Sequence, residues 1–207
     1  MYEASVPGPW LCFRQPGKIE QALAAPSTDS RHGQAIRRDF RPIGRLDPFA
    51  KTILCGTAPS EGGHVNVSPK GPIESLRILD SHTIEYDDWI GSGIETVAHL
   101  QENGRICVML CAFEGPPKIL RLHGRGEVLP TLDTGGGIRA VVRIHVERIA
   151  DSCGYGVPLM DYQGERPQPQ KWRDQKGPEG LRQYVQVHNA SSIDGLPGLS
   201  QERNLEN

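Results

Sequence analysis

The sequence lacks an excess of charge, a long apolar run and a leader-like beginning. Its 207 residues include 23 basic and 25 acidic side chains, a net charge of 23 − 25 = −2. This balance gives no reason to expect a nucleic-acid or membrane-surface partner. The longest apolar runs, such as residues 106–113, are too short to span a bilayer. The first ten residues contain no basic region followed by an apolar one, so we expect a soluble cytoplasmic protein.

Signatures of metal sites and of protein nucleophiles are also missing. The five cysteines are odd in number and show no CxxC spacing, which argues against a disulfide framework and a structural zinc site. His123 and His145 could face each other, but no acidic residue at ligand spacing accompanies them, so we expect no metal. There is no P-loop, no G-x-S-x-G and no dinucleotide-binding glycine motif after a strand. The sequence alone therefore identifies no catalytic residue.

Glycine and proline are abundant instead, with 24 + 17 = 41 of the 207 residues. So many turn-forming residues predict short elements and exclude a helical bundle. Residues 1–47 have scattered prolines and no sustained period, so we expect an irregular N-terminal segment there. Residues 48–207 are expected to form one domain.

Alternation of polar and apolar residues predicts short antiparallel strands in this domain. We expect strands at residues 52–58, 64–68, 76–79, 83–87, 106–113, 118–128 and 138–146. The last two have one apolar and one polar face, with Arg139 and Arg143 on the polar side, as in an antiparallel sheet covered on one side. Short antiparallel strands in this number favour a barrel over a doubly wound sheet.

The period becomes helical between residues 91 and 105. Ile94, Val97 and Ala98 recur at helical spacing, and Ser92 with Glu95 fits an S-x-x-E capping box, which predicts a helix over residues 92–103. Two further helices are expected near the C-terminal end of the chain, the second with proline in its first turn. They cover residues 169–175 and 178–188.

Two stretches could bind an anion. The first turn of the 92–103 helix offers unpaired N–H groups and a helix dipole, with Gly91 and Gly93 leaving the approach open. An ordinary capped helix has the same pattern, and no lysine or arginine lies in this stretch. The second stretch is NVSPKG, where Lys70 is a point charge suited to a phosphate. A solvated lysine in a turn would look the same.

The order and wording of these motifs resemble one known family. GHVNVSPKG, RILD, GSGIETVAHLQENGRI and AFEGPPKILRLHGRGEV follow one another as in FMN-binding split-barrel proteins similar to pyridoxamine 5′-phosphate oxidase. DSCGYGVPLMDYQGER, KWRDQKGPEGL and SSIDGLPGL resemble the C-terminal part of one subgroup, so the resemblance covers about residues 49–199. It implies a mainly β fold: a six-stranded antiparallel split β-barrel with one inserted helix and a helical C-terminal segment. It also implies a homodimer with two FMN molecules in its interface.

The resemblance further implies where FMN would bind. The strand at residues 64–70 would lie along the isoalloxazine ring, with Lys70 near the flavin or its phosphate. The first turn of the helix would receive the phosphate and ribityl end, and Glu114 and Arg121 would lie near the interface, facing the partner's flavin. The implied cofactor-binding residues are Asn66, Val67, Ser68, Lys70, Gly91, Ser92, Glu95, Thr96, Glu114 and Arg121. Family chemistry is hydride transfer to or from the flavin, so no protein nucleophile is needed.

The chain departs from this family's pattern in ways that leave its function open. Ile90 and Ile94 flank GSG where relatives carry polar residues, which removes two potential donors to the ribityl or phosphate group. The Arg/Lys-rich phosphate motif of true pyridoxamine phosphate oxidases is absent, so that activity is not assigned. The main hypothesis is an FMN-dependent oxidoreductase acting on an unidentified small molecule. The alternatives are a split barrel with lost or relaxed flavin binding that serves as a binding protein or non-redox enzyme, and a flavin or haem-type carrier or sensor without turnover.

Overall fold

The computed structural model describes residues 50–131 and 136–199. The irregular segment predicted at residues 1–47 lies outside these ranges. None of the helices in the described ranges is long and apolar enough to cross a membrane.

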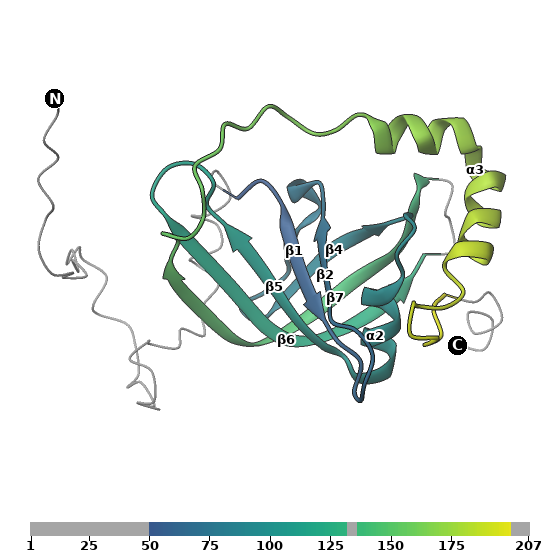
Figure 1. Cartoon of the computed structure of the whole chain (residues 1–207), viewed down its shortest axis with the longest axis horizontal. Helices are drawn as coiled ribbons and strands as arrows, with labels where there is room; N and C mark the ends of the chain where they lie inside the picture. The colour runs from purple at the N-terminus through teal and green to yellow at the C-terminus, as the bar shows by residue number, and fades with distance from the viewer. Residues whose placement is uncertain (1–49, 132–135, 200–207) are drawn as a thin grey trace, which may run out of the picture. The chain divides into compact units, whose positions relative to one another are not determined.

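The described residues form one sheet of seven strands, all paired antiparallel (Figure 1). Neighbouring strands follow the order β2, β1, β5, β6, β7, β4, β3. The strands are β1 (Ile53–Thr57), β2 (Asn66–Lys70), β3 (Arg77–Ile78), β4 (Thr83–Trp89), β5 (Arg105–Cys111), β6 (Lys118–Pro130) and β7 (Ile138–Cys153), and a short 3₁₀ helix, η1 (Ile73–Ser75), precedes β3. The mainly β prediction is confirmed. The seven strands agree in number with the seven that the residue pattern predicts, and exceed the six that the resemblance implies because the two-residue strand β3 pairs with β4 at the sheet edge.

The sheet curls until its two ends approach each other. Lys70 lies on β2 at one edge, and its ammonium nitrogen is 2.8 Å from a carboxylate oxygen of Asp88 on β4, which is next to the opposite edge. No backbone ladder joins β2 to β4 in the part of the chain that the structure describes. The barrel is therefore split along a seam between these two strands, and side chains bridge the seam.

Alternating side chains of the long strands fill the interior of the barrel. Leu120 and Leu122 of β6 and Ile144 of β7 are fully buried and belong to one apolar cluster that also contains residues of β1, β4 and β5. Burying each such side chain contributes about 1.5–3 kcal/mol of stability. At Gly124 the register of β6 and β7 shifts, and a Cβ there would collide with the backbone of His145, so only glycine fits this bulge.

Helix α2 (Glu95–Asn103) packs on β6 and β1. It ends as predicted, because Gly104 adopts the left-handed conformation at φ 70°. Its predicted start is wrong: the helix begins at Glu95, and no side chain caps it. Ser92 is exposed and lies before the helix. Ile94 packs with Val97 in a small apolar cluster, so burial of an isoleucine, rather than a capping box, fixes how the chain enters the helix.

Helix α3 (Gln168–His188) bends near its middle (Figure 1). Gly177 has φ 63° and ψ 172°, which are not helical angles, and Pro178 follows it. The segment therefore consists of two helices joined at Gly177, as the sequence predicts.

Candidate functional site

A cavity of about 220 Å³ opens beside the seam between β2 and β4. Its lining comes from β2, the end of β4, the loop that enters α2, the first turn of α2, and Arg139 of β7. Six of the predicted cofactor-binding residues line it, namely Asn66, Ser68, Lys70, Gly91, Glu95 and Thr96. The β2 residues meet here because residues two apart on a strand share one face.

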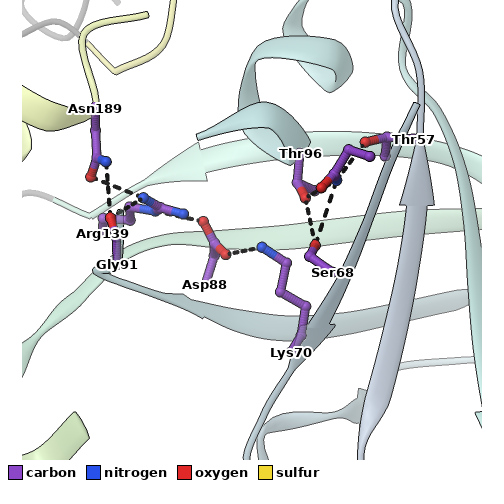
Figure 2. Close-up of polar contacts among 9 residues, drawn as sticks. Thr57, Ser68, Lys70, Asp88, Gly91, Thr96, Arg139 and Asn189 are labelled. Carbon is purple, nitrogen blue, oxygen red and sulfur yellow. Dashed lines mark hydrogen bonds and ion pairs between the residues drawn. The ribbon is translucent and has the colours of Figure 1, made fainter. Parts of the chain in front are cut away.

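Three charged side chains form a buried triad at the seam: Lys70, Asp88 and Arg139 (Figure 2). The two oxygens of Asp88 are shared between the cations, with Lys70 Nζ 2.8 Å from Oδ1 and Arg139 Nε 2.7 Å from Oδ2. The side chains of Asp88, Arg139 and Lys70 are only 1%, 3% and 12% exposed. Two cations and one anion leave the triad with a net charge of 2 − 1 = +1. An anion entering the cavity beside Lys70 would therefore meet the local positive charge of the triad, while the carboxylates of Asp87 and Glu95 line other parts of the same cavity.

The triad keeps Asp88 ionised. Burial opposes ionisation of Asp88, but the Lys70 ammonium and the Arg139 guanidinium outweigh it and hold the pKa of this carboxyl below its usual range. Asp88 therefore carries the negative charge that offsets one of the two cations near neutral pH.

Arg139 also connects the triad to the C-terminal part of the chain. Its Nη1 donates a hydrogen bond to Oδ1 of Asn189 at 2.9 Å. The Nδ2 of Asn189 in turn donates to the carbonyl oxygen of Gly91 at 3.0 Å. A continuous chain of contacts thus runs from Lys70 to the glycine loop of the cavity (Figure 2).

The opposite side of the cavity is an uncharged network of amide and hydroxyl groups. Asn66 Nδ2 donates to the hydroxyl oxygens of Thr57 and Thr96, both at 3.0 Å. Both amide hydrogens have partners, so Oδ1 of Asn66 remains as an acceptor. The hydroxyl oxygens of Ser68 and Thr96 lie 3.3 Å apart, so one hydroxyl donates its hydrogen to the other. The hydrogen of the second hydroxyl remains available for a ligand.

A buried histidine supports this network from behind. Nδ1 of His99 lies 3.0 Å from the Thr57 hydroxyl, and His99 is fully buried. Burial lowers the pKa of His99, so the ring is uncharged near neutral pH. His99 therefore supports the network of amide and hydroxyl groups without adding a charge to it.

The remaining predicted residues do not reach the cavity in a single chain. Val67 points to the outer face of β2 and is 69% exposed, and Ser92 is exposed before α2. Glu114 lies 3.5 Å from Lys51 and accepts the backbone N–H of Tyr162. Arg121, on the outer face of β6, donates to the Ser152 hydroxyl at 3.2 Å. The roles that the resemblance implies for these four residues stay predictions.

The two isoleucines flanking GSG are buried and do not line the cavity. Ile94 lies in an apolar cluster with Val97 and Leu199. Their side chains therefore belong to the core, and the cavity keeps the polar residues described above.

Among the residues that sequence reasoning missed are Asp88 and Arg139, which line the cavity, and Asn189, which contacts Arg139 from outside the lining. The prediction that Arg139 lies on an exposed polar face is wrong, because this side chain is buried against Asp88. The sequence gives no signal for Asp88, because the strand around it, TIEYDDW, is rich in polar residues and only the structure shows that this carboxylate is buried. Nothing near Asn189 in the sequence indicates its partners, which lie about fifty and one hundred residues away.

Comparison with known proteins places the chain in a family. No model of a protein family matches it. A pyridoxamine 5′-phosphate oxidase family protein of Aspergillus flavus, ustO, is 38% identical over 174 residues, which cover 71% of this chain and 70% of the relative. Among solved structures, an FMN-binding protein from Syntrophomonas wolfei has a TM-score of 0.40 and 15% identity, covering 51% of this chain and 80% of its own. A FAD-binding protein from Mesorhizobium loti has a TM-score of 0.39 and 14% identity, and the match covers 52% of this chain and 89% of that protein. On its identity to the Aspergillus flavus relative and the length that they share, the chain belongs to the pyridoxamine 5′-phosphate oxidase family.

Proposed function

We propose that this protein is an FMN-dependent oxidoreductase acting on a small molecule. The observation that carries the proposal is the buried triad with its net positive charge at the cavity. Buried charge is unfavourable unless a counter-charge compensates it, and the phosphate of FMN supplies one. Membership of the pyridoxamine 5′-phosphate oxidase family supports the same cofactor class.

The residues of the cavity fit the polar parts of FMN. The ammonium of Lys70 and the one available hydroxyl donor of Ser68 and Thr96 suit phosphate oxygens. Asn66 Oδ1 and the carboxylate of Glu95 are acceptors, so they suit the ribityl hydroxyls or a flavin N–H rather than the phosphate. When bound, FMN supplies two-electron redox chemistry, accepting or giving a hydride. The protein binds the cofactor, orients it and keeps Asp88 ionised beside Lys70.

We further propose that the complete site requires a homodimer. A cavity of about 220 Å³ is smaller than the usual ligand pocket of about 300–1,000 Å³, so one chain would enclose only part of FMN. Val65 and Val67, near and on edge strand β2, are 75% and 69% exposed, which suits a surface that a partner covers. Glu114 and Arg121 would then lie where the resemblance implies, facing the partner's flavin.

The visible spectrum of the purified protein tests the cofactor. We expect a yellow protein with flavin bands, or a colourless one that binds added FMN with micromolar affinity or better. Titration with riboflavin, which lacks the phosphate, should give much weaker binding. A protein that binds neither compound would contradict the proposal and favour a split barrel without flavin. Light scattering should give the mass of a dimer, and a monomer in the presence of FMN would contradict the shared site.

A further inference from the structure

The segment that follows α3, residues 189–199, contacts several elements that line the cavity. Its first residue, Asn189, is fully buried and uses both ends of its side-chain amide. The amide oxygen accepts from Arg139 Nη1 at 2.9 Å, and the amide nitrogen donates to the carbonyl of Gly91 at 3.0 Å. One small planar group therefore ties the glycine loop to strand β7.

The middle of the segment contacts Glu95, which lines the cavity, and His64, which lies outside the lining. The backbone N–H of Ile193 donates to Oε1 of Glu95 at 3.3 Å. The carboxylate of Asp194 accepts the backbone N–H of His64 at 2.8 Å and lies 2.7 Å from Nδ1 of the same histidine. His64 comes two residues before β2, so these contacts join the first turn of α2 to the hairpin that carries β2.

The segment has its own internal structure, which makes it a defined unit. Ser192 N–H donates to the carbonyl of Leu196 at 2.9 Å, and the N–H of Leu199 donates to the carbonyl of Asn189 at 3.1 Å. A Cβ at Gly198 would collide with the backbone of Asn189, so only glycine permits this close return of the chain. Leu199 then packs with the apolar cluster below the entrance of α2.

We propose that residues 189–199 form a brace that holds the walls of the cofactor cavity at a fixed separation, with Asn189 as a positioning residue. Asn189 does not line the cavity. It fixes Arg139, which shares Asp88 with Lys70, and it fixes the Gly91 carbonyl directly. The brace rests on the proposed function only in its effect on FMN, since all its contacts are between residues of the protein.

The first test replaces Asn189 by leucine, which keeps the approximate volume and removes both hydrogen bonds. Hydrogen–deuterium exchange of the backbone amides at residues 91–96 should become at least about fivefold faster, because the loop loses its attachment. The dissociation constant for FMN should rise about tenfold, as expected when two buried hydrogen bonds that shape the site are lost. Val187→Ala is the matched control, because Val187 is exposed on the same helix, and it should change neither quantity.

A second variant guards against misfolding of the first. Asp194→Ala removes contacts to His64, a residue that is 75% exposed and outside the barrel core, so the barrel should fold normally. Exchange at residues 64–66 should become faster, and FMN binding should weaken by about two- to fivefold. Unchanged exchange in both variants would overturn the brace, and so would faster exchange with unaltered FMN affinity. If the wild-type protein binds no FMN, the proposed function fails, while the exchange comparison alone still supports or overturns the brace.

Discussion

The two walls of the cavity both use strand β2, yet they differ in charge and in support. Lys70 belongs to the charged wall, where ion pairs connect β2 to β4 and β7 across the seam. Asn66 and Ser68 belong to the uncharged wall, where hydroxyl and amide groups connect β2 to β1 and α2. One strand face therefore supplies a charge at one end and neutral hydrogen-bonding groups at the other.

This difference indicates that the two walls have different roles in ligand binding. Hydrogen bonds to charged groups contribute about 1.5–3 kcal/mol, compared with about 0.5–1.5 kcal/mol for neutral ones. The charged wall should therefore determine how tightly an anionic ligand binds. The uncharged wall, which offers one donor and one amide acceptor, should determine how the ligand is oriented.

Removal of the central anion of the charged wall should have the largest effect. In Asp88→Asn the cations of Lys70 and Arg139 lose their shared counter-charge while still buried, which should lower the free energy of unfolding by about 3–5 kcal/mol. Urea denaturation measures this loss. Asp87→Asn is the matched control, because its partner Arg77 is 40% exposed, and it should lower stability by less than about 1 kcal/mol. Equal losses of unfolding free energy in the two variants would show that burial of the triad does not increase its contribution to stability.

Neutralising the cation of the charged wall should come second. Lys70→Met reduces the net charge of the triad from +1 to 0, and FMN should bind about 1.5–3 kcal/mol more weakly, roughly tenfold to a hundredfold. Titration by flavin fluorescence measures the change. Riboflavin, without a phosphate, should bind the variant and the wild-type protein alike. An equal loss for riboflavin would place Lys70 at the ring rather than the phosphate.

A change in the uncharged wall should be smaller. Thr96→Val keeps the shape of the side chain but removes the hydroxyl that contacts both Asn66 and Ser68. FMN affinity should fall by about 0.5–1.5 kcal/mol in the same titration. Ser92→Ala distinguishes two placements of the phosphate: affinity should stay unchanged if the phosphate lies in the cavity, because Ser92 is exposed and lies outside the cavity lining. If Ser92→Ala weakens binding more than Thr96→Val does, the phosphate lies over the loop instead.

The smallest effect should come from pH at the rim. Hydrogen bonds from His64 lower the pKa of Asp194, so its carboxylate is favoured in the folded state. A lowered pKa stabilises the fold above the ordinary Asp value of about 3.9, and this contribution is lost as the pH falls below it. The stability difference between the wild-type protein and Asp194→Ala should therefore be larger at pH 6 than at pH 3, measured by thermal unfolding. A difference that grows on acidification would contradict the assignment.

Much of the barrel could be predicted from the sequence because one face of each long strand is apolar. The pattern failed where the backbone leaves the regular pleat. Val146 and Ile149 are both buried although they are three residues apart, because Glu147 is the extra residue at the bulge opposite Gly124. The expected end of β7 at residue 146 was therefore too early, since the strand continues to Cys153.

The candidate site was predictable only in part. Motif order singled out the β2 face and the glycine loop as candidates, because each is a short continuous stretch, and both line the cavity. Arg139 and Asn189 could not be placed, since their partners are about fifty residues or more away and no local pattern encodes such a contact. The start of α2 was missed for a different reason: burial of Ile94 overrode the local capping signal.

The seam between β2 and β4 is a line of the described barrel that no backbone ladder closes. Every other pair of neighbouring strands in the described sheet must unzip a backbone ladder, whereas separation here needs only the loss of contacts such as that between Lys70 and Asp88. A ligand that binds residues on both sides of this seam would stabilise the closed form of the barrel. The melting temperature of the protein should then rise with the concentration of this ligand, because a ligand that binds only the closed barrel shifts the equilibrium toward the folded state.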